Sequence, residues 1–173
     1  MPAIPEKLNE FRVYVNGSPE LKGVSDLQLP SLKAMAETVG GGGIMGEYES
    51  PNYSHLESMK LTINWRSINS ELLDFLKPKS LKLDCRLVNQ ELDSVKMEHG
   101  FNVNRVVIRG IPISNDLGKA SKGSPYEGSS EIEVLYMKME SNGKTLIEID
   151  KLNYIYRVGD EDFMDKLKAA LGI

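Results

Sequence analysis

The dipeptide Asn142-Gly143 joins two runs that are rich in residues favoured in β-strands, Glu131–Glu140 and Thr145–Asp150. Asn and Gly readily adopt the positive φ values that a two-residue β-hairpin turn requires. The two runs are therefore predicted to pair as antiparallel strands. This hairpin is the strongest local constraint in the chain, and it indicates a fold built mainly from antiparallel β-structure.

Period-two alternation of apolar and polar residues recurs along the chain and is typical of half-buried strands. Met59, Leu61, Ile63 and Trp65 share one face of such a strand. Further strands are expected at residues 11–15, 27–29, 44–50, 81–87 and 103–111. With the hairpin, about eight antiparallel strands emerge, which favours a mainly β fold of the β-sandwich or partly rolled barrel type.

Two helices are expected to interrupt the strands. Ser67–Leu76 has apolar residues at helical spacing, and Pro78 stops it. The second is a C-terminal helix over Glu161–Leu171, with Asp160 as its N-cap and Gly172 at its end.

Two segments are predicted to be loops. The run Gly40, Gly41, Gly42 and Gly43 loses too much backbone entropy to hold a regular element, so a flexible joint or a close backbone contact is expected there. In Gly110–Ser130, 13 of 21 residues are Gly, Ser, Pro, Asn or Asp. Loops of that length inside a compact domain are uncommon and are usually functional or mobile.

Length and charge narrow the class of protein. The 173 residues suit a single domain over 1–173. The net charge is −4 and no run of Lys or Arg forms a cationic stripe, which disfavours tight nucleic-acid binding. Residues 1–10 contain no apolar run typical of a secretory signal, and no segment approaches the roughly 20 apolar residues that cross a bilayer. A cytoplasmic product without a membrane partner is expected.

A search for catalytic or metal-binding patterns is negative. Cys85 lies on the apolar face of a predicted strand and is interpreted as a buried thiol. His55 and His99 are 44 positions apart and lack partners at metal-ligand spacing. The acidic pairs Glu47/Glu49 and Glu131/Glu133 read as strand faces exposed to solvent. We therefore expect no enzyme, no cofactor and no metal.

The order of these pieces is similar to that in a known family. The relevant segments are Val15-Asn16-Gly17, Val24–Lys33, Gly40–Gly43, Leu56–Ile63, the helix ending at Leu76, Val107–Gly110, Asn142-Gly143, Glu148–Asp150 and the terminal helix closing in Leu171-Gly172. With this order the chain resembles the major tail tube proteins of contractile-tailed phages and R-type bacteriocins over nearly its whole length.

The resemblance implies a structural role without catalysis. Six copies would close into a ring around a lumen, and rings would stack into the inner tube of a contractile tail. The implied partners are further copies, a surrounding sheath protein, and baseplate and tail terminator proteins. DNA would cross the lumen without specific binding. The protein would belong to the virion tail, or to a tail-like particle, after assembly in the bacterial host cytoplasm.

Two sets of residues follow as hypotheses for the assembled particle. Glu47 and Glu49 are candidates for facing the lumen, where carboxylates repel phosphates. The alternative places them in solvent or against Lys60 of a neighbouring copy. Candidates for contacts between subunits are Gly40, Gly41, Gly42, Gly43, Gly110, Lys119 and Lys122.

Two other functions remain open. One is the inner-tube subunit of a type VI secretion system or another contractile injection system, which shares the fold. The other is a monomeric β-barrel that binds a small ligand or acts as an enzyme. Tubes or rings under the electron microscope would distinguish the first two functions from the third.

Overall fold

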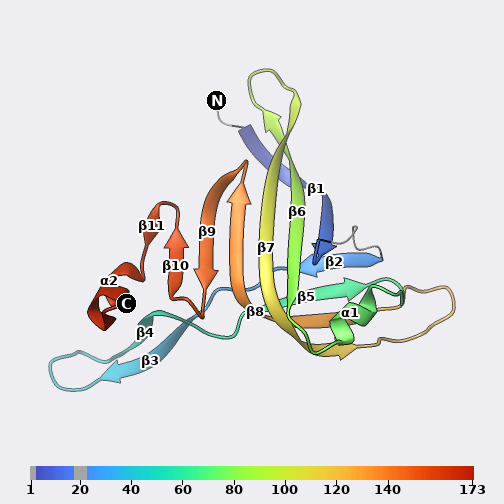
Figure 1. Ribbon diagram of the computed structural model, residues 1–173. Coiled ribbons are helices and arrows are strands. Elements are labelled where there is room, and N and C mark those ends of the chain that lie inside the picture. Colours follow the sequence, from blue (N-terminus) through green and yellow to red (C-terminus); the bar gives the residue numbers. More distant parts are fainter. Residues whose placement is uncertain (1–2, 18–22) are drawn as a thin grey trace.

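Strands dominate the computed structural model, which describes residues 3–17 and 23–173 (Figure 1). Eleven strands and two short helices follow one another within the described residues. They are β1 Ala3–Val15, β2 Val24–Gln28, β3 Ala34–Gly40, β4 Glu47–Leu56, β5 Lys60–Trp65, α1 Leu72–Leu76, β6 Leu81–Asp93, β7 His99–Asp116, β8 Gly128–Ser141, β9 Lys144–Asp150, β10 Ile155–Val158, β11 Glu161–Asp162 and α2 Asp165–Leu171.

Nine strands form one antiparallel sheet that folds over itself. Its main part runs in the order β1-β6-β7-β8-β9-β10-β11, and β5 pairs with the first half of β8 while β2 pairs with β5. In Figure 1, β2 and β5 run across the long axis of β6 and β7. Two layers with strands crossing at a steep angle make a sandwich-like architecture, as the sequence pattern predicts.

The corner between the two layers lies in β7 and β8. Arg109 pairs with Tyr136 and Gly110 pairs with Val134, so Leu135 is an extra residue in β8. Such a β-bulge bends its strand and increases the local twist. At Gly110 a Cβ atom would lie 2.2 Å from the carbonyl oxygen of Glu133, so the strands approach this closely only because the residue is glycine.

The core fills the space between the layers. The predicted alternating runs supply it: Met59, Leu61, Ile63 and Trp65 are buried, as are the alternate residues of β6 that include Cys85. The Cys85 thiol is buried as expected, and burial raises its pKa to about 12. Trp65 packs edge to face on Phe75 of α1, with 5.2 Å between ring centroids.

Both helices are shorter than predicted. The first helix is only α1, Leu72–Leu76, and Ile68 lies outside it with its side chain exposed. The prediction that the helix starts at Ser67 is wrong because residues 67–69 are irregular and residues 70–71 form a turn, and Asn69 accepts a hydrogen bond from the backbone N–H of Leu72.

The C-terminal helix starts at Asp165, and the prediction of Asp160 as its N-cap is wrong. Gly159-Asp160 is instead the two-residue turn between β10 and β11, with Val158 paired to Glu161. Gly159 has φ +60°, which this turn demands. The predicted end of the helix is confirmed, since Gly172 is its left-handed C-cap with φ +74°.

Both predicted loops contain strand. Gly40 belongs to β3, and only Gly41, Gly42 and Gly43 lie in the turn that follows. The polar stretch after Gly110 continues β7 to Asp116, so the connection to β8 spans residues 117–127. The described residues form eleven strands rather than the eight expected, because the sequence analysis does not predict β3, β10 and β11. Within the described residues, neither helix has the length and apolar character that spanning a membrane requires.

Candidate functional site

The β3–β4 hairpin, residues 34–56, forms a two-stranded sheet of its own and is called the arm from here on. It projects from the body beside β9 and β10 (Figure 1). Ile44, Met45 and Tyr48 near its tip are exposed apolar side chains, and the Met45 side chain is fully exposed. A two-stranded hairpin is marginally stable alone in water. The arm therefore has the character of a segment that needs a partner.

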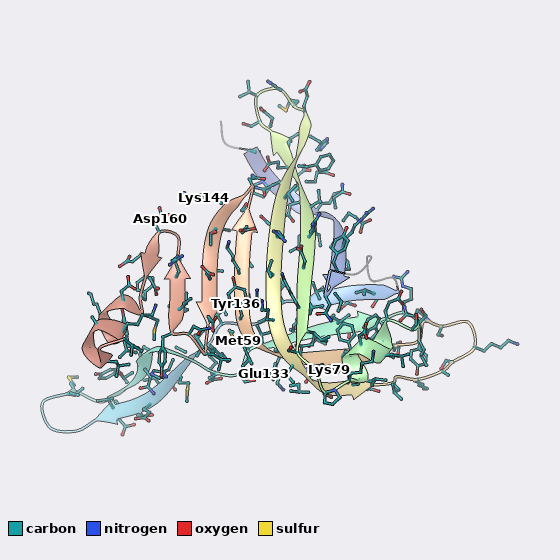
Figure 2. The ribbon with its side chains drawn as sticks, viewed as in Figure 1. Met59, Lys79, Glu133, Tyr136, Lys144 and Asp160 are labelled. Atoms are coloured by element: carbon teal, nitrogen blue, oxygen red, sulfur yellow. The ribbon has the colours of Figure 1, made fainter. Side chains whose placement is uncertain are left out.

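Polar contacts fix the root of the arm on the body. Lys33 forms an ion pair with Glu57 at 2.8 Å, and the Glu57 backbone N–H donates to the Lys33 carbonyl oxygen at 2.9 Å. The Lys151 ammonium donates to the Glu57 carbonyl oxygen at 2.9 Å and lies 3.5 Å from a Glu133 carboxylate oxygen. Ser58 also donates to Glu133. Figure 2 shows Glu133 close to Met59 at this junction. The arm is thus held in a defined direction.

One margin of the main sheet is open. Within residues 3–17 and 23–173, β1 pairs with β6 alone, so one side of this 13-residue strand carries backbone groups that no other described strand pairs with. The opposite margin ends in β11, which has two residues and leads into α2. An unpaired long edge is a template for pairing with another chain. The two ends of the sheet therefore differ in their capacity to accept a further strand.

The outward face of the main sheet is basic where it covers the core. On this face the strand register brings together seven cationic side chains and four carboxylates. They are Arg12, Lys82, Arg86, Arg105, Arg109, Lys138 and Arg157, with Asp84, Glu140, Glu148 and Asp150. Arg105 binds Asp84 through two hydrogen bonds of 2.9 and 2.7 Å, and Lys138 pairs with Glu140 at 2.7 Å.

The outward face of the β2-β5-β8 layer is acidic. Asp26, Asp116, Glu131 and Glu133 lie on it with Lys60, and the Lys151 ammonium lies 3.5 Å from Glu133 at its edge. Lys60 lies 3.5 Å from Glu131 of the same copy. The two outward faces of the sandwich thus carry opposite excess charge. The Glu131/Glu133 pair, which the sequence analysis treats as solvent-exposed, is half-buried and belongs to this acidic face.

Asp84 makes the basic face sensitive to acid. Hydrogen bonds from Arg105, more than its charge and that of Arg86, hold the pKa of Asp84 below its ordinary value of 3.8. A carboxyl whose folded pKa is depressed stabilises the fold above the unfolded pKa, and this contribution is lost as pH falls through the folded pKa. We therefore expect thermal stability to fall below about pH 4, and to fall less in Asp84→Asn. Equal pH profiles of melting temperature for both proteins would contradict this.

The predicted site residues fall in separate regions. Glu47 and Glu49 share one face of β4, both exposed, and Gly41–Gly43 lie in the turn at the tip of the arm. Lys119 and Lys122 are exposed in the 117–127 loop on the other side of the molecule. Gly110 is buried at the corner of the sandwich. The structure thus gives Gly110 a role within the subunit and places the other candidates on surfaces open to a partner.

The sequence analysis missed a groove beside the 117–127 loop. Arg66, Ile68, Lys122 and Tyr126 line it, and its volume is about 540 Å³. The backbone N–H of Tyr126 donates to the Arg66 carbonyl oxygen at 3.1 Å, which ties the loop to the end of β5. Ile68 is one of the apolar residues in the predicted helix Ser67–Leu76, but its side chain is exposed and lines this groove.

The parts of the chain that the structure describes contain no group of three or more His, Cys, Asp or Glu residues arranged to hold a metal ion. His55 lines a pocket at the root of the arm, and His99 lies 3.4 Å from Glu6. The exposed surfaces, rather than any cluster of reactive groups, are therefore the candidate functional site.

Comparison with known proteins shows that the chain is similar to phage tail tube proteins. Residues 5–172 match the family model described as phage tail tube protein FII. The major tail tube protein of Serratia phage KSP20 is 26% identical over 177 residues, which cover 99% of this chain and 98% of that protein. The tail tube protein of Escherichia phage P2 is 25% identical over 181 residues, covering 99% of both chains.

Among solved structures, the fold is similar to that in the sheath/tube terminator of PVC, an extracellular contractile injection system, in its extended state. The TM-score is 0.52 at 11% identity, and the match covers 79% of this chain and 96% of the other.

Proposed function

Because the chain belongs to the phage tail tube protein FII family, we propose that its copies close into hexameric rings and that these rings stack into the inner tube of a contractile tail. The match that supports this proposal spans residues 5–172, so the arm, the open β1 edge and the C-terminal helix all lie within the shared region. We propose that the whole chain acts as one tail tube domain with a structural role and no catalytic one.

The open surfaces supply a physical reason for assembly. In a permanent monomer, an unpaired 13-residue strand edge and a projecting arm with exposed apolar side chains would favour aggregation. Both are removed from water when copies pack side by side. A head-to-tail contact repeated around an axis generates a closed ring.

DNA would cross the lumen of the tube during ejection without binding specifically to the wall. A basic wall would bind DNA through counterion release, whereas an acidic wall repels its phosphates. The acidic face around Asp26, Glu131 and Glu133 therefore suits a lumen wall better than the basic face around Arg105 does. The lumen position of Glu47 and Glu49 stays a prediction.

The further partners are a sheath protein around the tube, and baseplate and tail terminator proteins at its ends. Assembly is proposed to take place in the bacterial host cytoplasm. The alternative, the inner tube of another contractile injection system, draws support from the fold shared with the PVC sheath/tube terminator. A sheath gene beside capsid and terminase genes would indicate a phage, and a sheath gene without them would indicate a bacteriocin or an injection system.

Sedimentation of the purified protein across a range of concentrations tests the proposed assembly. We expect the single-chain species to give way to a discrete ring and then to long particles as concentration rises. A single-chain species at every concentration would overturn the proposal and favour the monomeric binding protein.

A further inference from the structure

The sequence contains two Asn-Gly dipeptides, and the structure holds both of them in the same way. We propose that Asn16 and Asn142 are modification sites, at which water converts the side-chain amide to a carboxylate without an enzyme. Hydrogen bonds from a neighbouring strand set the rate of this reaction. The reaction takes place within a single chain and goes beyond the proposed role in assembly.

Glycine after asparagine favours the reaction, because no side chain hinders the approach of its backbone nitrogen. That nitrogen attacks Cγ of the asparagine and closes a five-membered succinimide ring. The Cγ–Nδ2 bond breaks, and the amide leaves as ammonia with the proton of the glycine nitrogen. Water then opens the ring at either of its carbonyls and gives aspartate or isoaspartate. One water is consumed and one ammonia is released, with no oxidation or reduction.

Both turns are open to this chemistry. Asn16, Gly17, Asn142 and Gly143 are all exposed. A Cβ atom built on either glycine would have no heavy atom within 4 Å beyond its chain neighbours. Figure 2 labels Lys144, the residue directly after the second turn, at the end of the sheet. Water therefore reaches both reactive bonds.

A neighbouring strand binds the Asn142 side chain. The Asn142 backbone N–H donates to the Val103 carbonyl oxygen at 2.9 Å, and the Val103 N–H donates to Oδ1 of Asn142 at 3.2 Å. In a regular antiparallel pair the second bond would go to the backbone carbonyl of the opposite residue. Here the side-chain oxygen takes its place, because Asn142 has φ +47° and the main chain turns away. Asn142 thus continues the β7–β8 ladder by one residue.

Asn16 repeats this arrangement at the end of β1. Its backbone N–H donates to the Lys82 carbonyl oxygen at 2.8 Å, and the Lys82 N–H donates to Oδ1 of Asn16 at 3.0 Å. Val15 pairs with Leu83, so Asn16 continues the β1–β6 ladder by one residue. Its φ is +49°, close to that of Asn142. Two turns far apart in the sequence therefore use the same pair of hydrogen bonds.

These hydrogen bonds oppose the reaction. Cγ has to turn toward the glycine nitrogen before the ring closes, so the bond from Val103 or Lys82 to Oδ1 must break first. The backbone of the turn also has to leave its folded conformation, which requires local opening. Two hydrogen bonds at each turn are sufficient to lower the rate at least about tenfold relative to the unfolded chain.

The two products differ in their effect on the fold. Aspartate keeps an oxygen that accepts the N–H of Val103, and it suits the same type of turn. Isoaspartate lengthens the main chain by one carbon, so the pairing of Ser141 with Lys144 across the turn is disturbed. Modification at both sites changes the formal net charge from −4 to −6, because each new carboxylate adds one negative charge.

Peptide mass spectrometry after incubation at mildly alkaline pH tests the proposal. Deamidation at Asn16 and Asn142 should be at least about tenfold slower in the folded wild type than in guanidinium chloride. Asn52 and Asn153 are exposed and precede tyrosine, so these internal controls should react far more slowly in the unfolded chain. Gly143→Ala, measured unfolded, should slow the reaction at Asn142 only. Equal rates in the folded and unfolded wild type, or no reaction at either Asn-Gly site, would overturn the proposal.

Proline substitutions separate the two turns. Val103→Pro removes the N–H that Asn142 accepts, and Lys82→Pro removes the one that Asn16 accepts. Each folded variant should deamidate faster at its own asparagine and at the wild-type rate at the other, so each is the control for the other. Wild-type rates at both sites in the folded variants would contradict control by these hydrogen bonds.

Amide hydrogen exchange makes the same comparison in the wild type, without any substitution that disturbs a strand. As guanidinium chloride is raised below the unfolding midpoint, deamidation at Asn142 should accelerate in parallel with exchange of the Val103 amide. A deamidation rate that stays constant while Val103 exchange accelerates would overturn the proposal.

Discussion

Replacing Gly110 with alanine is expected to lower the free energy of unfolding by about 3 kcal/mol, at the upper end of the usual cost of overpacking. The added Cβ would lie 2.2 Å from the carbonyl oxygen of Glu133 and 2.7 Å from Cγ2 of Ile132. Both atoms belong to β8 at the corner of the sandwich, so β7 and β8 must separate there. For a chain of this length the melting temperature should fall by about 6–12 °C.

Gly100→Ala is the matched control, because Gly100 lies in the same strand. Its nearest neighbour would be Cγ of Glu91 at 3.7 Å, an ordinary contact. This variant should be as stable as the wild type or slightly more stable, since alanine reduces the conformational freedom of the unfolded chain. Equal melting temperatures for both variants would show that the close approach at Gly110 does not hold the corner.

Truncating Phe75 is expected to cost about 3–5 kcal/mol, the range found when a buried aromatic side chain is replaced by alanine. Phe75 is fully buried and packs on Trp65, and its carbonyl oxygen accepts a hydrogen bond from Asn115 at 3.0 Å. The five-residue helix α1 is too short to be stable by itself, so this packing holds it. Phe75→Ala should lower the urea midpoint strongly.

The fluorescence of Trp65 reports the loss of the Phe75 side chain, because Trp65 is the only tryptophan in the sequence. Its fluorescence emission should shift to longer wavelength in folded Phe75→Ala as water reaches the ring. Leu73→Ala on the same helix removes a side chain that is 55% exposed, and it should leave both emission and midpoint close to the wild type. A Phe75→Ala midpoint no lower than that of Leu73→Ala would refute this account of the core.

The sequence predicts those parts of the fold in which one face is buried. Met59–Trp65 and the run around Cys85 alternate strictly because one side of each strand covers the core, and both predictions are confirmed. The Asn142-Gly143 turn is confirmed as well, with φ values of +47° and +80°. In these segments local preference and tertiary burial agree, so reading the sequence is sufficient.

Errors arise where tertiary context overrides composition. Ser114, Asn115 and Asp116 look like loop residues, yet they continue β7 because they pair with β8. Asp160 has the composition of a helix cap, but with Gly159 it makes a hairpin turn. The β8 residues that pair with Ser114–Asp116 lie beyond a loop, and the strand β11 that follows Asp160 has only two residues. The local sequence pattern therefore reveals neither pairing.

The candidate site could be predicted only as separate pieces. Glycine runs and charged residues indicate exposed segments, and the sequence analysis names Glu47, Glu49, Lys119 and Lys122 on that basis. Their arrangement on opposite sides of the sandwich depends on the corner at Gly110 and on the anchored root of the arm. An arrangement that depends on contacts between residues far apart in the sequence produces no periodic pattern in that sequence.

End-on views of assembled particles in the electron microscope test most directly whether copies of this chain surround a hollow axis. The account predicts class averages with sixfold rotational symmetry and an open centre. Averages with a filled centre, or concentrated samples that show only single copies, would contradict it.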